Sequence, residues 1–206
     1  MKTVISKDGT QIAYDVYGSG PVLVFITGAS CFRNFMPVKA DAKGLAEGFT
    51  VYNYDRRGRG DSGDQGPYTI SKELEDIEAL IDASGQKAIL YGHSSGAMLA
   101  LEAGLKFPDK ILKVIIYDAA YVAGPKEKTE YAELIAKVKG CVEEGSNVKA
   151  LRSFLTGIGM PKVFVFMLPL MPGWKTMKAL APTLLYDMEL TQEEAPVERL
   201  AKITVP

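Results

Sequence analysis

Residues 88–96 read AILYGHSSG, a short apolar run that passes directly into a serine between two glycines. The apolar run is typical of a strand that is covered on both faces. The segment that follows, residues 95–107, is apolar almost all round and stops before Pro108, which favours a buried helix. The stretch therefore predicts a strand, a sharp turn and a helix in immediate succession, with Ser94 at the turn.

The turn carries the pattern Gly-x-Ser-x-Gly, which is typical of a nucleophile. Its glycines let the neighbouring backbone approach closely because they have no Cβ. The turn lifts the side chain of Ser94 off the end of the strand, so Ser94 is the candidate nucleophile. The helix begins immediately afterwards, so the backbone N–H of Ser95 can stabilise an oxyanion on a substrate, helped by the helix dipole. A second donor is expected in the turn after residues 22–26. Gly28 and Ala29 both fit this place, and the N–H of Ala29 is the better candidate of the two.

Residues 1–118 alternate between strand patterns and helix patterns. Short apolar runs rich in β-branched or aromatic residues predict buried strands at residues 22–26, 51–54, 88–91 and 114–117. Residues 10–17 alternate between polar and apolar side chains and can pair as a hairpin with residues 3–6. This order predicts an α/β fold built on a mostly parallel sheet.

Residues 119–202 carry helical periodicity and show no clear strand until residues 203–205. We therefore expect a helical insertion. Five of the eight methionines lie in it, and such deformable apolar side chains can either form the core of the insertion or face a substrate. The candidates for an apolar substrate pocket are Phe164, Met167, Met171 and Trp174.

Composition excludes several classes of protein. The 206 residues fit one globular domain with an insertion, and 24 basic against 25 acidic residues give a net charge of −1. A chain with so little net charge has no overall electrostatic attraction to nucleic acid or to an anionic membrane, so neither is expected as a partner. Two distant cysteines make neither a disulfide framework nor a zinc site, and no metal or cofactor is expected. The chain shows no signal peptide and no apolar run long enough to span a membrane, which favours the cytoplasm.

Three segments together resemble the α/β-hydrolase family. Residues 92–96 resemble the nucleophile elbow of that family, and residues 22–30 resemble its strand and oxyanion turn, with Thr27 where many members have histidine. Residues 54–62, YDRRGRGDS, resemble its structural turn D-x-R-G-x-G-x-S. The resemblance implies an eight-stranded sheet with two leading antiparallel strands and a helical lid after the sixth strand. On this basis about six strands form a core over residues 1–118, the lid covers residues 119–202, and residues 203–206 begin the seventh strand.

The same resemblance implies a catalytic triad in the order serine, acid, histidine, with the acid after the seventh strand and the histidine after the eighth. The chain has one histidine, His93, and it precedes Ser94. Adjacent side chains at a sharp turn diverge, so we expect His93 to pack beside the elbow rather than to act as the base. We expect the acid and the histidine beyond Pro206. Asp118, after the sixth strand, matches the place of an alternative acid in some relatives, although a strand end often carries a turn-forming aspartate.

Residues 58–63 also fit the dinucleotide-binding pattern G-x-G-x-x-G. The next helix begins only near Ser71, so the required context is missing and this interpretation is weak. Three arginines in the same loop stand beside three aspartates, which favours a local salt-bridged loop over a phosphate site. These residues are Arg56, Arg57 and Arg59 with Asp55, Asp61 and Asp64.

The hypothesis from sequence is a serine hydrolase that acts on a small, largely apolar ester or related acyl compound. Without the triad histidine, these 206 residues alone are expected to be nearly inactive. The alternative is a binding protein of the same fold that holds a small ligand without turnover. We also expect self-association through an exposed sheet edge at residues 114–117, where an apolar, β-branched strand offers unpaired peptide groups.

Overall fold

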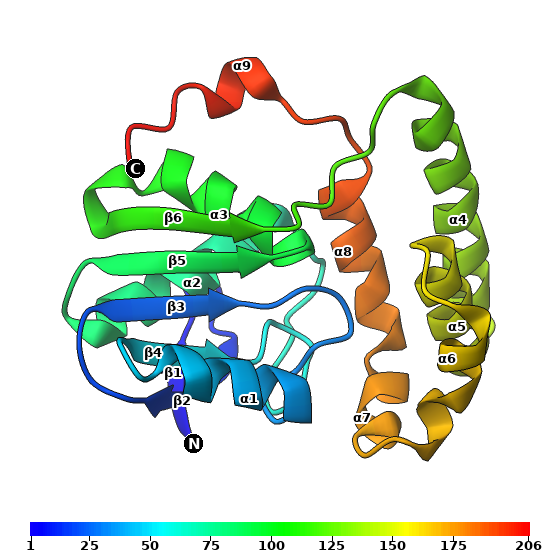
Figure 1. Ribbon diagram of the computed structural model, residues 1–206, viewed down its shortest axis with the longest axis horizontal. Coiled ribbons are helices and arrows are strands. Elements are labelled where there is room, and N and C mark those ends of the chain that lie inside the picture. The colour runs from blue at the N-terminus through cyan, green and yellow to red at the C-terminus, as the bar shows by residue number, and fades with distance from the viewer. The chain divides into compact units, whose positions relative to one another are not determined.

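The computed structural model, which describes residues 1–206, contains a six-stranded sheet (Figure 1). In the order in which they lie side by side, its strands are β1 (Lys2–Ile5), β2 (Gln11–Tyr17), β4 (Thr50–Tyr54), β3 (Val22–Ile26), β5 (Ala88–His93) and β6 (Ile111–Tyr117). The first two strands pair antiparallel and β2 pairs antiparallel with β4, whereas β4, β3, β5 and β6 are parallel. The α/β fold with a mostly parallel sheet is therefore confirmed.

Helices cover both faces of the sheet, which is why its central strands carry apolar side chains on both sides. Every residue of β3 is buried. On one face, α1 (Met36–Leu45) packs against the sheet in a cluster that contains Val38, Ala42 and Phe25. On the other face lie α2 (Ile70–Ser84) and α3 (Ser95–Lys106) (Figure 1). A short turn, η1 (Pro108–Lys110), leads from α3 into β6.

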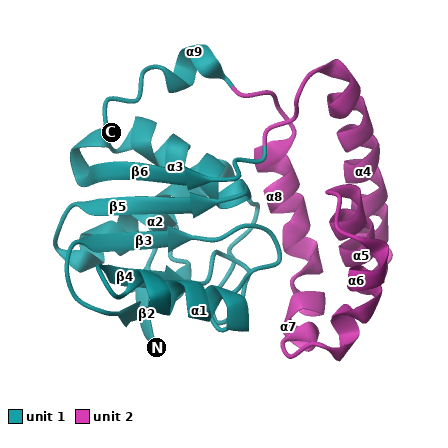
Figure 2. Cartoon of the chain, viewed as in Figure 1, with its two compact units in different colours: residues 1–120, 196–206 teal, residues 121–195 magenta.

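The chain divides into two compact units, residues 1–120 with 196–206, and residues 121–195 (Figure 2). All regular elements of the second unit are helices. Its core contains Val138, Leu151, Phe154 and Leu184. Its elements are α4 (Pro125–Glu143), α5 (Asn147–Gly157), α6 (Lys162–Met167), η2 (Leu168–Leu170), α7 (Trp174–Ala179), η3 (Ala181–Thr183) and α8 (Leu184–Thr191). None of the helices is both long and apolar enough to cross a membrane.

We expected the helical segment to reach residue 202. The compact helical unit of the structure ends at Ala195. Residues 196–206, which include α9 (Val197–Leu200), group with the sheet. Arg199 forms an ion pair with Glu102 of α3, with 2.6 Å between Nη1 and Oε2. The N–H of Val114 in β6 donates to the carbonyl of Pro206 at 2.9 Å. These contacts bring the end of the chain beside the outermost strand.

The arginines after β4 are buried, and the ion pairs of this salt-bridged loop reach beyond the loop itself. Arg56, Arg57 and Arg59 are each at most 1% exposed. Arg57 donates from Nε and Nη2 to the carboxylate of Asp76 in α2, at 2.8 and 2.7 Å, and from Nη1 to Asp8 at 2.9 Å. Burial raises the pKa of Asp8, but hydrogen bonds from Arg57 and from Thr10 outweigh it and hold the pKa well below its ordinary value. The loop therefore fastens α2 to the turn between β1 and β2.

The aspartate, second glycine and serine of the D-x-R-G-x-G-x-S turn hold its shape. The carboxylate of Asp55 accepts from the backbone N–H of Arg33 at 2.6 Å and of Asp61 at 3.0 Å. Gly60 has φ of 54°, and a Cβ there would lie 2.2 Å from a carboxylate oxygen of Asp55. Ser62 donates to the carbonyl of Asp55 and accepts from the N–H of Ala13 in β2. The segment is structural, as the resemblance implied.

β6 is the outermost strand on its side of the sheet, and part of its outer edge has no neighbour. Val114 is paired with Pro206, but Ile115, Ile116 and Tyr117 are exposed. Peptide groups of alternate residues in a parallel strand face the same edge, so those of Ile116 face outward like those of Val114. An apolar, β-branched edge of this kind can pair with another chain.

We therefore predict that the 206-residue chain self-associates at high micromolar concentration and that Ile115→Lys reduces the association, because a charge cannot be buried in a strand pair. Ile5→Lys is the matched control, since Ile5 is exposed on β1 at the opposite edge of the sheet. Light scattering over a concentration series measures the effect. A wild-type chain that stays monomeric, or equal effects of the two lysines, would contradict the prediction.

Candidate active site

The elbow after β5 holds Ser94 in a strained backbone conformation. β5 ends at His93, α3 begins at Ser95, and Ser94 between them has φ of 55° and ψ of −124°. A residue with a side chain rarely adopts positive φ, and such strain is found most often at functional sites. The strand, the sharp turn and the helix follow one another in the predicted order, and the side chain of Ser94 is half-buried at the turn.

Three glycines make this conformation possible, because the atoms around them leave no room for a Cβ at these positions. A Cβ on Gly92 would lie 2.4 Å from the carbonyl oxygen of Gly96, and one on Gly96 would lie 2.2 Å from the carbonyl oxygen of Ile26. A Cβ on Gly28 would lie 2.9 Å from the Cβ of Ser94 and 3.4 Å from its Oγ. The turn after β3 is therefore packed directly against the nucleophile candidate.

The two candidate oxyanion donors stand on the two segments that meet here. Ser95 is the first residue of α3, and the N–H groups of a first helical turn point out of the helix towards its N-terminal end. Ala29 follows Gly28 and is half-buried. Because Gly28 touches Ser94, both N–H groups belong to the immediate surroundings of the serine. Their role as an oxyanion hole stays a prediction.

Strained residues gather along one edge of the sheet. The residues other than glycine with positive φ are Ser30, Ser94 and Asp118, with values of 58°, 55° and 53°. They lie beyond the carboxyl ends of β3, β5 and β6, which are neighbours in the sheet. In open α/β sheets, ligands bind outside the carboxyl ends of the strands. This edge is therefore the candidate place for a functional site.

His93 and Asp118 flank the elbow without completing a triad with Ser94. The ring of His93 lies beside that of Tyr117, with 5.4 Å between centroids, because the two residues are partners in the β5 and β6 register. The N–H of Ser94 donates to the carbonyl of Tyr117 at 3.0 Å. Asp118 follows Tyr117 and is exposed, so it stands level with Ser94 on the next strand. His93 thus packs on the sheet, and Asp118 lies exposed at the end of β6 beside the elbow.

Two of the buried arginines hold the backbone of the oxyanion turn. Nη1 of Arg56 donates to the carbonyl of Thr27 at 3.2 Å and to Oγ of Ser95 at 3.1 Å. Nη1 of Arg59 donates to the carbonyl of Gly28 at 2.7 Å. Sequence reasoning missed these roles, because the contacts join residues that are 29 to 39 positions apart.

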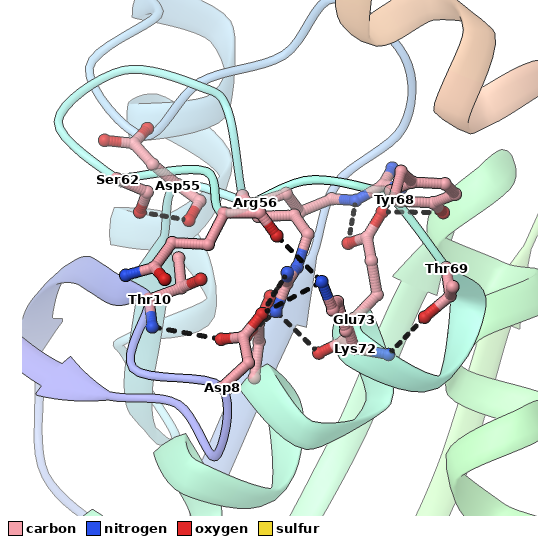
Figure 3. A network of polar contacts seen from close by, with 12 residues as sticks. Asp8, Thr10, Asp55, Arg56, Ser62, Tyr68, Thr69, Lys72 and Glu73 are labelled. Carbon is pink, nitrogen blue, oxygen red and sulfur yellow. Dashed lines mark hydrogen bonds and ion pairs between the residues drawn. The ribbon is translucent and has the colours of Figure 1, made fainter.

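The guanidinium of Arg56 is itself held by the carboxylate of Glu73 in α2 (Figure 3). Nε donates to Oε2 of Glu73 at 2.9 Å, and Nη2 makes a second, short contact with Oε1. The hydroxyl of Tyr68 donates to the same carboxylate at 3.1 Å. A paired, two-contact arrangement of this kind fixes the plane of the guanidinium as well as its position.

The candidate pocket residues lie in the second unit, on α6 and the segment that follows it. Phe164 is 44% exposed and Met167 is 54% exposed, whereas Met171 and Trp174 are half-buried. The buried side chains of the same segment are Val165, Leu168 and Met177. The unit therefore builds its core without Phe164 and Met167, which leaves these two available for contact with a ligand.

No group of three or more histidine, cysteine, aspartate or glutamate side chains could hold a metal ion. A separate open pocket of about 880 Å³ lies along β1, β2 and α1. Basic side chains predominate in it, and neither Ser94 nor the oxyanion turn contributes to it. Its lining includes Lys2, Arg33, Lys39, Lys43 and Asp15.

The packing around the elbow generates a first test of the site. We predict that Gly96→Ala lowers the free energy of unfolding by about 3 kcal/mol or more, because the new Cβ would overlap backbone that cannot move without shifting β3. Gly44→Ala in α1 is the control, since nothing lies within 4 Å of its Cβ position and alanine is the better helix former, so it should change stability by no more than about 1 kcal/mol. Urea unfolding followed by circular dichroism measures both. Equal effects of the two substitutions would mean that the elbow is not packed against β3.

Comparison with known proteins agrees with this geometry. The chain matches the sequence model of the alpha/beta hydrolase family over residues 23–205. It is 32% identical over 145 residues to a 2-(acetamidomethylene)succinate hydrolase of Mesorhizobium japonicum, a match that covers 68% of this chain and 49% of that protein. The chain thus spans about half the length of this curated relative.

Solved structures give the same result for the fold. An alpha/beta hydrolase from Sphaerobacter thermophilus is 36% identical with a TM-score of 0.87, covering 100% of this chain and 79% of the other. An esterase from Exiguobacterium antarcticum is 22% identical with a TM-score of 0.75, covering 100% and 78%, and shows a likeness of fold alone. With a family match over residues 23–205 and a solved relative that is 36% identical over the whole chain, the chain belongs to the alpha/beta hydrolase family.

Proposed function

We propose that this protein is a serine hydrolase that cleaves a small, largely apolar ester or related acyl compound, with Ser94 as its nucleophile. One observation carries the proposal: Ser94 is held at positive φ at the carboxyl end of β5, with Gly28 of the oxyanion turn against its side chain. Strain of this kind costs free energy, and a fold that keeps it at this position uses it to present the serine. The curated relative and the Sphaerobacter structure are both named hydrolases.

In the proposed mechanism, Oγ of Ser94 attacks the carbonyl carbon of the substrate while a base takes the hydroxyl proton. The carbonyl oxygen becomes an oxyanion and is stabilised by the N–H groups of Ala29 and Ser95. The tetrahedral intermediate collapses to an acyl-enzyme as the alcohol or amine leaves with a proton from the base. Water, activated by the same base, then releases the acid and restores the serine.

The base in this mechanism is a histidine supplied from outside residues 1–206. His93 is the one histidine of the chain, and its ring packs beside Tyr117 on the sheet. An acid must orient the added histidine, and this acid is either Asp118, which stands level with Ser94, or another residue outside residues 1–206.

The apolar nature of the substrate is inferred from the second unit. Phe164, Met167, Met171 and Trp174 offer flexible or flat apolar surfaces that adapt to an acyl chain. We propose that these side chains set the preference for acyl length. Acyl chemistry suits the serine, since attack on an ester or amide carbonyl places negative charge on the oxygen that an oxyanion hole stabilises.

A second candidate function is a binding protein of the same fold that has no turnover. The observation that favours it is the absence of any histidine positioned for Ser94 within these 206 residues. In that case the strained edge of the sheet would hold an acyl compound without cleaving it.

We predict that the 206-residue chain hydrolyses p-nitrophenyl acetate about 10⁴- to 10⁶-fold more slowly than a longer chain that carries the residues encoded after Pro206, because the base is missing. In the longer chain, Ser94→Ala should abolish turnover. Ser84→Ala, a serine at the end of α2, should leave turnover unchanged. Initial rates of p-nitrophenol release measure all of these.

Two outcomes would contradict the proposal. Fast turnover by the 206-residue chain that Ser94→Ala abolishes would mean that the base lies within residues 1–206. A longer chain that hydrolyses no member of an ester and amide panel, yet binds one of them tightly, would establish the binding protein instead.

A further inference from the structure

We propose that Arg59 and Arg56 are positioning residues for the oxyanion hole, and that Arg59 sets the direction of the Ala29 N–H. This inference rests on the proposed function, because it concerns how the same site is held.

The contact between Arg59 and Gly28 fixes one peptide plane. A peptide unit is planar and trans, so the carbonyl of Gly28 and the N–H of Ala29 point in opposite directions. Nη1 of Arg59 holds that carbonyl at 2.7 Å, and Arg59 is 1% exposed. The N–H of Ala29 therefore points away from the buried arginine, towards the edge of the sheet where Ser94 stands.

This peptide needs an external support because Gly28 cannot supply one. Glycine is required at this position, since a Cβ would lie 2.9 Å from the Cβ of Ser94. Glycine also has the greatest backbone freedom of any residue, so the peptide after it can rotate at little cost. A buried guanidinium that donates to one side of the peptide removes this freedom.

Arg56 fixes the distance between the two segments that supply the donors. The same nitrogen, Nη1, donates to the carbonyl of Thr27 in the oxyanion turn and to Oγ of Ser95 at the elbow. Its other nitrogens are occupied by Glu73 of α2. One guanidinium thus ties the turn after β3, the elbow and α2 together, and its planar fork of donors fixes their relative orientation.

Arg57 provides a matched control within the same loop. It is as buried as Arg56 and Arg59 and is paired with Asp76 and Asp8. The hydrogen bonds of its guanidinium go to those carboxylates and to the carbonyl of Lys72, and none goes to the oxyanion turn or to the elbow. If the arginines serve stability alone, substitutions of Arg57 and Arg59 should have the same consequences.

The test uses the longer, histidine-containing chain and measures two quantities at a temperature where each variant is folded by circular dichroism. The first is the second-order rate constant for modification of Ser94 by a fluorophosphonate. The second is kcat and KM for p-nitrophenyl acetate. We expect Arg59→Met to lower the modification rate and kcat by about 10²- to 10³-fold with KM changed less than 5-fold, since loss of one oriented donor affects the transition state. Arg57→Met should lower stability while both rates stay within about 3-fold of wild type.

Arg59→Lys keeps the test decisive if Arg59→Met does not fold, because it retains a buried positive charge. It should lose at least 10-fold in kcat, since the donor is no longer held in a planar fork. A rate unchanged in Arg59→Lys, or equal rate losses in the Arg57 and Arg59 variants, would overturn the inference. Failure of the wild-type chain to react with the fluorophosphonate would instead overturn the proposed function itself.

Discussion

The buried ion pairs between the loop after β4 and helix α2 are the constraint on which the rest of the first unit depends. Arg56 and Arg57 enter the interior with almost no exposed surface and meet Glu73 and Asp76 there. Taking such charges out of water is costly, and the cost is offset only when every donor and acceptor is satisfied. Removing one partner of such a pair costs about 3–5 kcal/mol, because the other charge stays buried. The loop must therefore adopt a geometry in which each of these buried arginines is paired with a carboxylate of α2.

This constraint extends to the edge of the sheet where the strained residues lie. The loop that satisfies Glu73 and Asp76 also donates to the carbonyls of Thr27 and Gly28. Those carbonyls belong to the turn that touches Ser94. A strained conformation persists only where its surroundings determine it completely. In this protein the surroundings are three glycines, which permit the close approach, and two arginines, which hold the approaching backbone.

Much of this arrangement could be predicted from sequence because it depends on local patterns. The apolar run before Gly92, the glycines around Ser94 and the apolar segment after it determine a strand, an elbow and a helix through contacts between near neighbours. Hydrophobic patterns likewise predicted β3, β4 and β6. The family to which the chain belongs followed from the combination of the elbow with residues 54–62.

The rest of the structure depends on contacts between residues that are far apart in the chain, and local sequence patterns do not predict such contacts. Arg56, Arg57 and Arg59 stand next to aspartates in the sequence, and that proximity predicted ion pairs within the loop. The structure pairs Arg56 and Arg57 with Glu73 and Asp76 of α2, which lie 17 and 19 residues away. In the sequence, Glu73 and Asp76 are typical of a solvated helix face. In the structure the loop packs on them and both are buried. The grouping of residues 196–206 with the sheet also involves long-range contacts, such as the ion pair between Arg199 and Glu102 and the hydrogen bond from Val114 to Pro206.

The most direct measurement is a high-resolution structure of the longer chain after its reaction with a fluorophosphonate. The account predicts a phosphorus atom bonded to Oγ of Ser94 and a phosphoryl oxygen about 2.7–3.1 Å from the N–H groups of both Ala29 and Ser95. It also predicts that the carbonyl of Gly28 still accepts from Arg59. A phosphoryl oxygen that points away from Ala29, or a Gly28 carbonyl turned away from Arg59 towards the adduct, would contradict the claim that the buried arginines orient the site.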